Sequence, residues 1–251
     1  MTAIDRYARA VDAYLGRYHR HEFEVDAPLP TTPALIVSNH GFGGVIDLNA
    51  MALARVLLHL RVHENVTVLV HQIAWTLGAG RLMESLGARP GSPEAVREAF
   101  DAGRHVAVFP GGDVDAAKPW KERNNVCFAG RTGFARIAIE HGVPIVPVVT
   151  AGAGETLFVL WDGQPLARVL RLPKLLRMKA MPVSVSIPWG LNVGAVGMLP
   201  YLPLPSKLST AVLPPMTAED GETAADLAAR VETAMQQRLT QLVHDRTPFL
   251  G

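Results

Sequence analysis

The stretch GRTGFARIAIEHGVPIVPVVTAG, residues 130–152, joins a helix pattern to a strand pattern through a short turn. The part GRTGFARIAIEHG predicts a helix that Gly142 closes, because glycine is favoured just past a helix C terminus. The part PIVPVVTAG predicts a buried strand, because it is an almost unbroken apolar run. A helix that leads directly into a buried strand is typical of α/β proteins with a parallel sheet.

The same alternation extends toward the N terminus. Segment 3–18 spaces its apolar residues at helical intervals and predicts an amphipathic N-terminal helix. Ser92, Pro93 and Gly103 are suited to begin and end another helix. The remaining predicted elements are strands at 34–38, 65–71 and 105–110 and helices at 48–60 and 76–87. We therefore predict a single α/β domain with a mainly parallel central sheet flanked by helices.

Composition narrows the class of protein. Apolar residues make up 49% of the 251 residues, charged residues 19%, and the formal net charge is +1. This charge gives no reason to expect nucleic acid as a partner. The single cysteine, Cys127, excludes an internal disulfide and fits a reducing compartment. No signal-peptide pattern and no clean membrane-spanning run are evident, so we expect a cytoplasmic protein, soluble or peripheral on the inner face of the membrane.

The turn SNHGFGGVID, residues 38–47, follows a predicted buried strand and contains His40, with Asp47 seven positions later. An imidazole titrates near neutral pH, and a carboxylate beside it fixes its tautomer and stabilises its charged form. The glycines, including Gly43 and Gly44, would let a carbonyl or thioester approach the backbone closely. The turn alone leaves two interpretations: an acid–base site, or a polar turn in which Asp47 only caps the next helix.

A second glycine turn opens the stretch FPGGDVDAAKPWKER, residues 109–123. Gly111 and Gly112 would expose backbone amides near several cations, which suits the phosphate of a lipid headgroup or of a nucleotide-bearing thioester donor. The pattern of a nucleotide-binding P-loop is missing, so hydrolysis of nucleoside triphosphates is not expected. A solvated charged loop is the alternative. The cations are Lys118, Lys121 and Arg123.

Three blocks in this order resemble the glycerolipid acyltransferases: NHG at 39–41, FPGG at 109–112, and the opening block with the AGAGET that completes it. The likeness spans roughly 35–156. It is closest to the branch of the monoacylglycerol and diacylglycerol acyltransferases and their bacterial relatives. It implies the α/β fold of the glycerol-3-phosphate acyltransferases.

The resemblance implies that His40 is a general base and Asp47 its partner. The family pattern is His-x4-Asp, whereas this chain has His-x6-Asp, so contact between the two side chains is a prediction. The resemblance also makes Arg131 and Glu155 substrate-binding candidates. Gly111 stands where many members carry glutamate, as in the neutral-lipid branch. Amides of either glycine turn would stabilise the oxyanion.

In that family the acceptor hydroxyl attacks an acyl thioester directly, without an acyl-enzyme. The resemblance therefore implies O-acyl transfer from acyl-coenzyme A or an acyl-carrier protein to a hydroxyl of a glycerolipid or similar amphiphile, with no metal or other cofactor. Two further classes stay open. One is a non-catalytic lipid-binding protein on the same scaffold, and the other is a thioesterase or an acyltransferase for a non-lipid hydroxyl.

We divide the predicted domain into an N-terminal helical segment (1–30), a catalytic core (31–160), a basic apolar segment (163–218) and a C-terminal helix (219–251). The segment 163–218 contains six Lys or Arg residues and neither Asp nor Glu. Basic residues interleaved with Leu and Met are typical of an element that lies on an anionic membrane surface. A basic solvated face packed on the sheet is the alternative interpretation.

Other candidate chemistries have simpler explanations. His59 and His63 have the spacing of a two-histidine metal face, but no third ligand pattern accompanies them. His19 and His21 form a similarly weak cluster. Cys127 lies between apolar residues and is more typical of a packed thiol than of a nucleophile.

Overall fold

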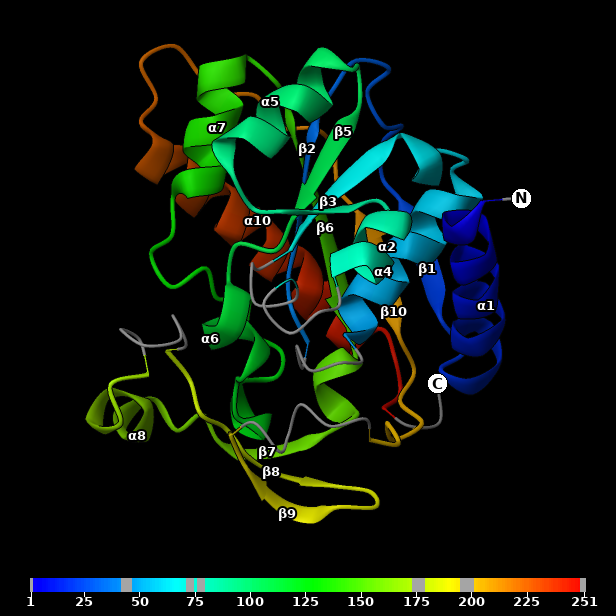
Figure 1. Cartoon of the computed structure of the whole chain (residues 1–251), viewed down its shortest axis with the longest axis vertical. Coiled ribbons are helices and arrows are strands. Elements are labelled where there is room, and N and C mark those ends of the chain that lie inside the picture. The colour runs from blue at the N-terminus through cyan, green and yellow to red at the C-terminus, as the bar shows by residue number, and fades with distance from the viewer. Residues whose placement is uncertain are drawn as a thin grey trace.

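The computed structural model describes residues 2–41, 47–70, 75, 80–172, 179–194 and 201–248. Its main sheet has seven strands in the order β1-β10-β6-β2-β5-β3-β4 (Figure 1). These strands are β1 (Glu22–Val25), β2 (Leu35–Ser38), β3 (Val66–Val70), β4 (Ala88–Pro90), β5 (His105–Val108), β6 (Ile145–Ala151) and β10 (Ser209–Val212). A smaller antiparallel sheet consists of β7 (Phe158–Trp161), β8 (Val183–Ser186) and β9 (Gly190–Val193).

The main sheet is mostly parallel. The five neighbouring strands β6, β2, β5, β3 and β4 run in one direction. Strand β10 is antiparallel to β6, and β1 pairs parallel to β10, so these two strands run the opposite way. The predicted mainly parallel sheet is confirmed, with two reversed strands added at one side.

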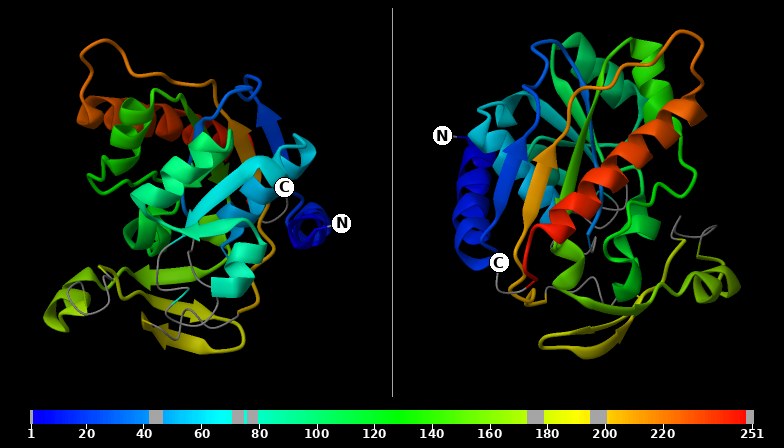
Figure 2. Two further views of the ribbon diagram at one scale, coloured as in Figure 1. Left: turned by 45° about the horizontal axis from the view of Figure 1, so that its top comes forward. Right: turned by 180° about the vertical axis from the view of Figure 1, so that it is seen from behind.

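Helices cover both faces of the main sheet (Figure 2). On one face lie α5 (Pro93–Asp101), α7 (Gly133–His141) and α10 (Ala224–His244). On the other lies α2 (Leu48–His59), against which the N-terminal helix α1 (Ala3–Tyr18) packs. The short elements are α4 (Gly80–Ser85), α6 (Gly112–Ala116), α8 (Gln164–Val169) and the 3₁₀ turns His63–Asn65, Trp120–Glu122 and Ala153–Glu155.

Strand β2 shows why both faces are covered. Leu35 and Val37 belong to the core formed with α5, α7 and α10, whereas Ile36 belongs to the core formed with α2. All four residues of β2 are buried. A strand with helices on both sides needs a continuous apolar run rather than an alternating one, which is the pattern in the sequence.

The helix ends follow local chemistry. Ser92 Oγ accepts a hydrogen bond from the Ala95 amide at 3.2 Å and caps α5. Gly142 has φ of 61°, a left-handed conformation that glycine adopts without a steric penalty, and it ends α7. These signals explain why the sequence predicts the central helices well.

The three motif-bearing turns meet at one edge of the main sheet. His40 follows β2, Gly111 follows β5 and Glu155 follows β6, and these three strands are neighbours that run parallel. The carboxyl edge of a parallel sheet is where loops of α/β proteins form binding sites. The small sheet β7-β8-β9 lies beyond this edge (Figure 1). Among the described helices, none is long and apolar enough to cross a membrane.

Candidate active site

His40 and Asp47 lie together at the end of β2. His40 Nδ1 and Asp47 Oδ2 are 2.7 Å apart, and each side chain is 16% exposed. The longer His-x6-Asp spacing therefore still allows contact. Because the carboxylate accepts the Nδ1–H, the lone pair of the neutral ring is on Nε2. Within the described residues, Nε2 has no hydrogen-bond partner.

Asp47 is also the N-cap of α2. Its Oδ1 accepts hydrogen bonds from the amides of Asn49 at 2.9 Å and Ala50 at 3.1 Å, while its Oδ2 contacts His40. The two interpretations of Asp47 from the sequence are therefore compatible, since each carboxylate oxygen has one set of partners. The helix fixes the direction of the carboxylate, and the carboxylate in turn orients the imidazole.

Charges around His40 control its basicity. Burial by itself lowers the pKa of His40, because a low-dielectric environment disfavours the imidazolium. The carboxylate of Asp47, through its charge and its hydrogen bond, and the charge of Asp115 oppose this effect, while Lys118 acts in the same direction as burial. The net result is a pKa of His40 above its ordinary value.

A buried ion pair holds the backbone of His40. Asp115 Oδ2 accepts the His40 amide at 2.7 Å, and Asp115 Oδ1 lies 2.7 Å from Lys118 Nζ. Lys118 Nζ also donates to the carbonyls of His40 at 3.1 Å and Asn125 at 2.6 Å. An ammonium has three N–H donors, so these three partners occupy all of them. The pair thus binds both backbone groups of His40: Asp115 accepts its N–H, and Lys118 donates to its C=O.

Two asparagines fix the turn that contains His40 by hydrogen bonds to the backbone. Asn39 exchanges hydrogen bonds with the backbone of Thr150 on β6, at 3.1 and 2.9 Å. Asn49 on α2 donates to the Asn39 carbonyl at 2.7 Å. A Cβ on Gly41 would lie 2.5 Å from the Cβ of Ala153, so only glycine fits directly after His40. These contacts tie β2, β6 and α2 together around the imidazole.

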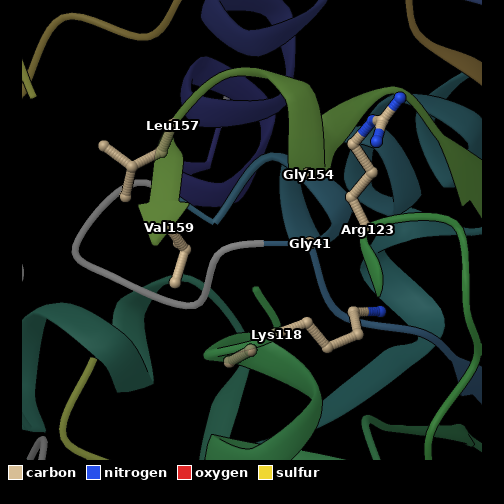
Figure 3. Close-up of a pocket in the computed structure, with 7 residues that line it drawn as sticks. Gly41, Lys118, Arg123, Gly154, Leu157 and Val159 are labelled. Atoms are coloured by element: carbon tan, nitrogen blue, oxygen red, sulfur yellow. The ribbon is translucent and has the colours of Figure 1, made fainter. Parts of the chain in front are cut away.

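A pocket opens beside Gly41. Gly41, Lys118, Arg123 and Gly154 line it together with Ala116, Leu157 and Val159. In Figure 3 the apolar side chains of Leu157 and Val159 lie on one side of Gly41 and the cationic Lys118 and Arg123 on another. The pocket therefore combines an apolar wall with cations next to the turn that carries His40.

Arg123 differs from Lys118 in how its donors are used. Its Nη1 donates to the Trp120 carbonyl at 2.9 Å, and its guanidinium lies 4.7 Å from the centre of the Trp120 ring. Its Nε lies 3.7 Å from Glu155 and has no hydrogen-bond partner among the described residues. Arg123 thus has N–H groups without a partner among the described residues.

Arg131 binds the turn after β5. Its Nη1 donates to the carbonyls of Pro110, at 3.1 Å, and Gly111, and its Nη2 lies 2.8 Å from Asp113. Gly112 has φ of 51° and its amide donates to Phe109 at 3.2 Å. The Gly112 amide is therefore engaged within the turn, and Arg131 holds the shape of that turn.

Glu155 is buried in a second ion pair. Both of its oxygens contact the guanidinium of Arg246, and Ser206 Oγ donates to Oε2 at 2.7 Å. Arg246 follows α10 and also donates to the Lys207 carbonyl at 3.1 Å. This pair joins the turn after β6 to the end of the C-terminal helix.

The remaining candidates lie apart from the site. Lys121 is exposed, 3.7 Å from Glu122. Gly43 and Gly44 lie outside the described residues. His59 and His63 bind different aspartates of α1, Asp12 and Asp5, each at 2.8 Å, rather than converging on one ligand position.

Three further candidates are shielded from solvent, His19 and His21 fully and Cys127 in part. His19 Nδ1 lies 2.9 Å from the Ser206 carbonyl and His21 Nε2 lies 2.8 Å from Thr210 Oγ1, and burial lowers the pKa of both rings. Burial also raises the pKa of the Cys127 thiol, which disfavours the nucleophilic thiolate.

Asp115 and Arg246 were missed from the sequence. Asp115 stands three residues before Lys118, a spacing that brings two side chains together on a helix, and this signal could have indicated the pair. Arg246 has no such local signal, because its partner is 91 residues away.

Comparison with known proteins identifies the family of this chain. A family model described as "Acyltransferase" matches residues 20–151, which is more than half of the chain and includes the turns of His40 and Gly111. The chain belongs to this acyltransferase family. The solved structure of the 1-acyl-sn-glycerophosphate acyltransferase PlsC from Thermotoga maritima has the same fold. It superposes with a TM-score of 0.53 at 16% identity, over 94% of this chain and 79% of that one.

Two relatives illustrate the similarity in sequence. A "DGAT1/2-independent enzyme synthesizing storage lipids" of Gallus gallus is 28% identical over 92% of this chain and 62% of its own length. An uncharacterized protein of Mycobacterium tuberculosis is 29% identical over 85% of this chain and 58% of its own length. The chain thus spans about three fifths of the length of these relatives.

Proposed function

We propose that the protein is an O-acyltransferase that moves a fatty acyl group from an acyl thioester to a hydroxyl of a glycerolipid or similar amphiphile. The donor is acyl-coenzyme A or an acyl-carrier protein, and no metal or other cofactor takes part. The observation that carries the proposal is the His40–Asp47 hydrogen bond at the carboxyl edge of the sheet, in a chain of the acyltransferase family. The lipid-synthesising relative supports the choice of acceptor class.

His40 is the general base in this mechanism. Its Nε2 takes the proton of the acceptor hydroxyl as the oxygen attacks the thioester carbonyl. The tetrahedral intermediate then collapses, the C–S bond breaks, and the imidazolium returns the proton to the departing thiolate. Asp47 stabilises the imidazolium between these steps, and no acyl-enzyme forms. The products are the ester and the free thiol, so atoms and charge balance.

The other residues divide between positioning and binding. We assign Asp115 and Lys118 to positioning, because they hold the His40 backbone and Lys118 has no donor left for a phosphate. Arg123, which keeps unused donors, is the candidate for the phosphate of the donor or acceptor. Peripheral association with the inner face of the membrane would bring this site to its acceptor.

The test is His40→Ala, assayed by mass spectrometry of the products from labelled acyl thioesters and a panel of acceptors. Removing the base should lower transfer by roughly a hundredfold to ten-thousandfold. Circular dichroism should show the wild-type fold. A folded variant with full activity would exclude the mechanism.

The same assay separates the competing functions. Release of free fatty acid without an acceptor would favour a thioesterase. Binding of lipid without any turnover would favour a non-catalytic role on this scaffold. Transfer only to a hydroxyl that is not on a lipid would retain the mechanism and change the acceptor.

A further inference from the structure

The small sheet exposes an apolar face to solvent. Its register places Phe158, Val185 and Leu191 in one cross-strand row and Trp161, Val183 and Val193 in the next. Because side chains in these rows point to the same side of the sheet, the six residues form one continuous apolar surface. We call this surface the outer face. All of its residues are exposed except Val183, which is half-buried, and Leu191 reaches 67% exposure.

The opposite side of the sheet is buried, and two of the three residues in its central cross-strand row are polar, beside Val159. Ser184 and Asn192 are paired across β8 and β9, and both are almost completely shielded from solvent. Asn192 Nδ2 donates to Ser186 Oγ at 2.8 Å, which helps to satisfy this polar row. A sheet in water normally buries its apolar side and exposes its polar side. Here the strands do the reverse, so the outer face needs another apolar phase to cover it.

Further apolar side chains extend the outer face at its ends. Ile187, Trp189 and Leu202 are each about half exposed near the ends of β8 and β9. At the other end lies α8, beside the sheet in both views of Figure 2. Val169, its last residue, is 78% exposed, and Leu170, which follows the helix, is exposed as well. Tryptophan is favoured where an apolar phase meets water.

The exposed charges next to this surface are mostly basic, with Asp162 directly after Trp161 and Asp113, whose carboxylate accepts the Lys179 amide, as the nearby acids. Arg168, Arg171 and Lys179 are exposed, and within the described residues none of their side-chain cations forms an ion pair with a carboxylate. The whole segment 163–218 lacks Asp and Glu. Such a rim is complementary to an anionic surface. A symmetric dimer through the outer face would bring two basic rims together, which is unfavourable.

We propose that the outer face of the small sheet is a membrane-docking surface that lies at the headgroup and acyl-chain boundary of an anionic bilayer. The edge strands β7 and β9 pair only with β8, so their outer backbone groups need hydration, which the headgroup region supplies. The apolar face can therefore lie at this boundary while the basic rim contacts lipid phosphates. The bilayer is thus the apolar phase that the inverted sheet requires.

The docking surface and the candidate site share one strand. Val159 of β7 lines the pocket beside Gly41, whereas its neighbour Phe158 points to the outer face and stacks on Trp120, with ring centres 4.1 Å apart. A single strand therefore separates the bilayer from the pocket. The docking proposal rests on the proposed acyltransferase function. If both hold, an amphiphilic acceptor would travel only a short way from the bilayer to His40.

The experiment measures binding without turnover. The full chain is sedimented with vesicles of equal parts phosphatidylcholine and phosphatidylglycerol, and with phosphatidylcholine alone. Leu191→Ser and Val193→Ser should each weaken partitioning into the anionic vesicles by about tenfold. Arg168→Gln and Arg171→Gln should each weaken it by about fivefold, and only with anionic lipid. Leu82→Ser and Arg136→Gln, exposed changes on α4 and α7, are the matched controls and should have no effect.

The outcomes are distinct. Equal binding of all variants, or no binding by the wild type, would overturn the proposal. A dimer that Leu191→Ser dissociates, without vesicle binding, would show that a second copy covers the face. Transfer to a water-soluble acceptor should be normal in Leu191→Ser and reduced when the acceptor is in vesicles. Failure of all transfer in the wild type would reject the proposed function and leave the binding result intact.

Discussion

The Asp115–Lys118 pair and the Glu155–Arg246 pair are both buried beside the pocket, yet they hold different parts of the chain. The first contacts the N–H and the C=O of His40. The second joins the turn after β6 to the residues behind α10 and does not touch His40. Asp115 and Lys118 follow the FPGG block and Glu155 lies in the AGAGET block, whereas Arg246 lies outside all three blocks. The two ion pairs differ in one respect: Asp115–Lys118 contacts the backbone of His40, and Glu155–Arg246 does not.

Among substitutions in the two ion pairs, the largest effect is expected for Asp115→Asn. The variant leaves Lys118 buried without its counter-charge, which should destabilise the protein by about 3–5 kcal/mol. It also loosens the backbone of His40, and displacement of a base by about 1 Å costs roughly a hundredfold in rate. Because the Asp115 charge raises the pKa of His40, its loss should move the acidic limb of the kcat profile to lower pH. Denaturant unfolding and pH-dependent kinetics measure both effects.

A purely structural Asp115 would give a different result. Turnover per folded molecule and the acidic limb would then stay at their wild-type values while only the unfolding midpoint fell. The comparison with Glu155 makes this difference measurable.

Glu155→Gln should reduce stability by a similar amount, about 3–5 kcal/mol, because it leaves Arg246 buried without its partner. Turnover and its pH profile should stay near wild type below the unfolding transition, since Glu155 has no contact with His40. The double change of Glu155→Leu with Arg246→Met should regain much of the stability, as apolar replacements of buried ion pairs often do. A large loss of turnover in folded Glu155→Gln would instead place Glu155 in substrate binding.

The central fold was predictable because its signals are local. The Ser92 cap, the Gly142 stop and the buried run of β2 each depend on a few neighbouring residues. The small sheet was not predicted. Its alternating apolar and polar residues fix two faces but do not tell which one is buried, and the polar face is the buried one.

The site was predictable in part for the same reason. His40 and Asp47 are close in sequence and the structure brings them into contact, although their catalytic roles stay predictions. Lys118 was predicted as a phosphate contact, because a sequence shows a cation but not that its three donors have partners inside the chain. Strand β10 and Arg246 depend on partners far away in sequence and carry no local signal.

Asp47→Asn separates the two roles of Asp47 and should have a moderate effect. Asparagine still caps a helix well, so stability should change little, but the neutral amide no longer stabilises the imidazolium. We expect roughly a tenfold to hundredfold lower kcat. The acidic limb should move to lower pH, because Asp47 raises the pKa of His40. Asp47→Ala should in addition lose about 1 kcal/mol of stability with the cap.

The same substitution tests a stability effect with a defined sign. A folded-state pKa of His40 above its unfolded value of about 6.5 stabilises the protein below that pH, and this contribution is lost as the pH rises through the folded pKa. Asp47→Asn should therefore reduce the loss of stability between slightly acidic and alkaline pH. An unchanged pH dependence of unfolding would contradict the assigned charge coupling.

The smallest effect is expected for a substitution of Arg123, which lies near one member of each ion pair, Lys118 and Glu155. It lines the pocket with Lys118, its Nε is 3.7 Å from Glu155, and it keeps donors that Lys118 lacks. Arg123→Gln should raise KM for a phosphate-bearing substrate by about fivefold, the loss of one partly screened ion pair of about 1 kcal/mol, with kcat nearly unchanged. Lys121→Gln is the matched control, because Lys121 is an exposed cation two residues away that does not line the pocket. If both variants raise KM equally, the cations attract the substrate through their combined electrostatic field, and Arg123 makes no specific contact with the phosphate.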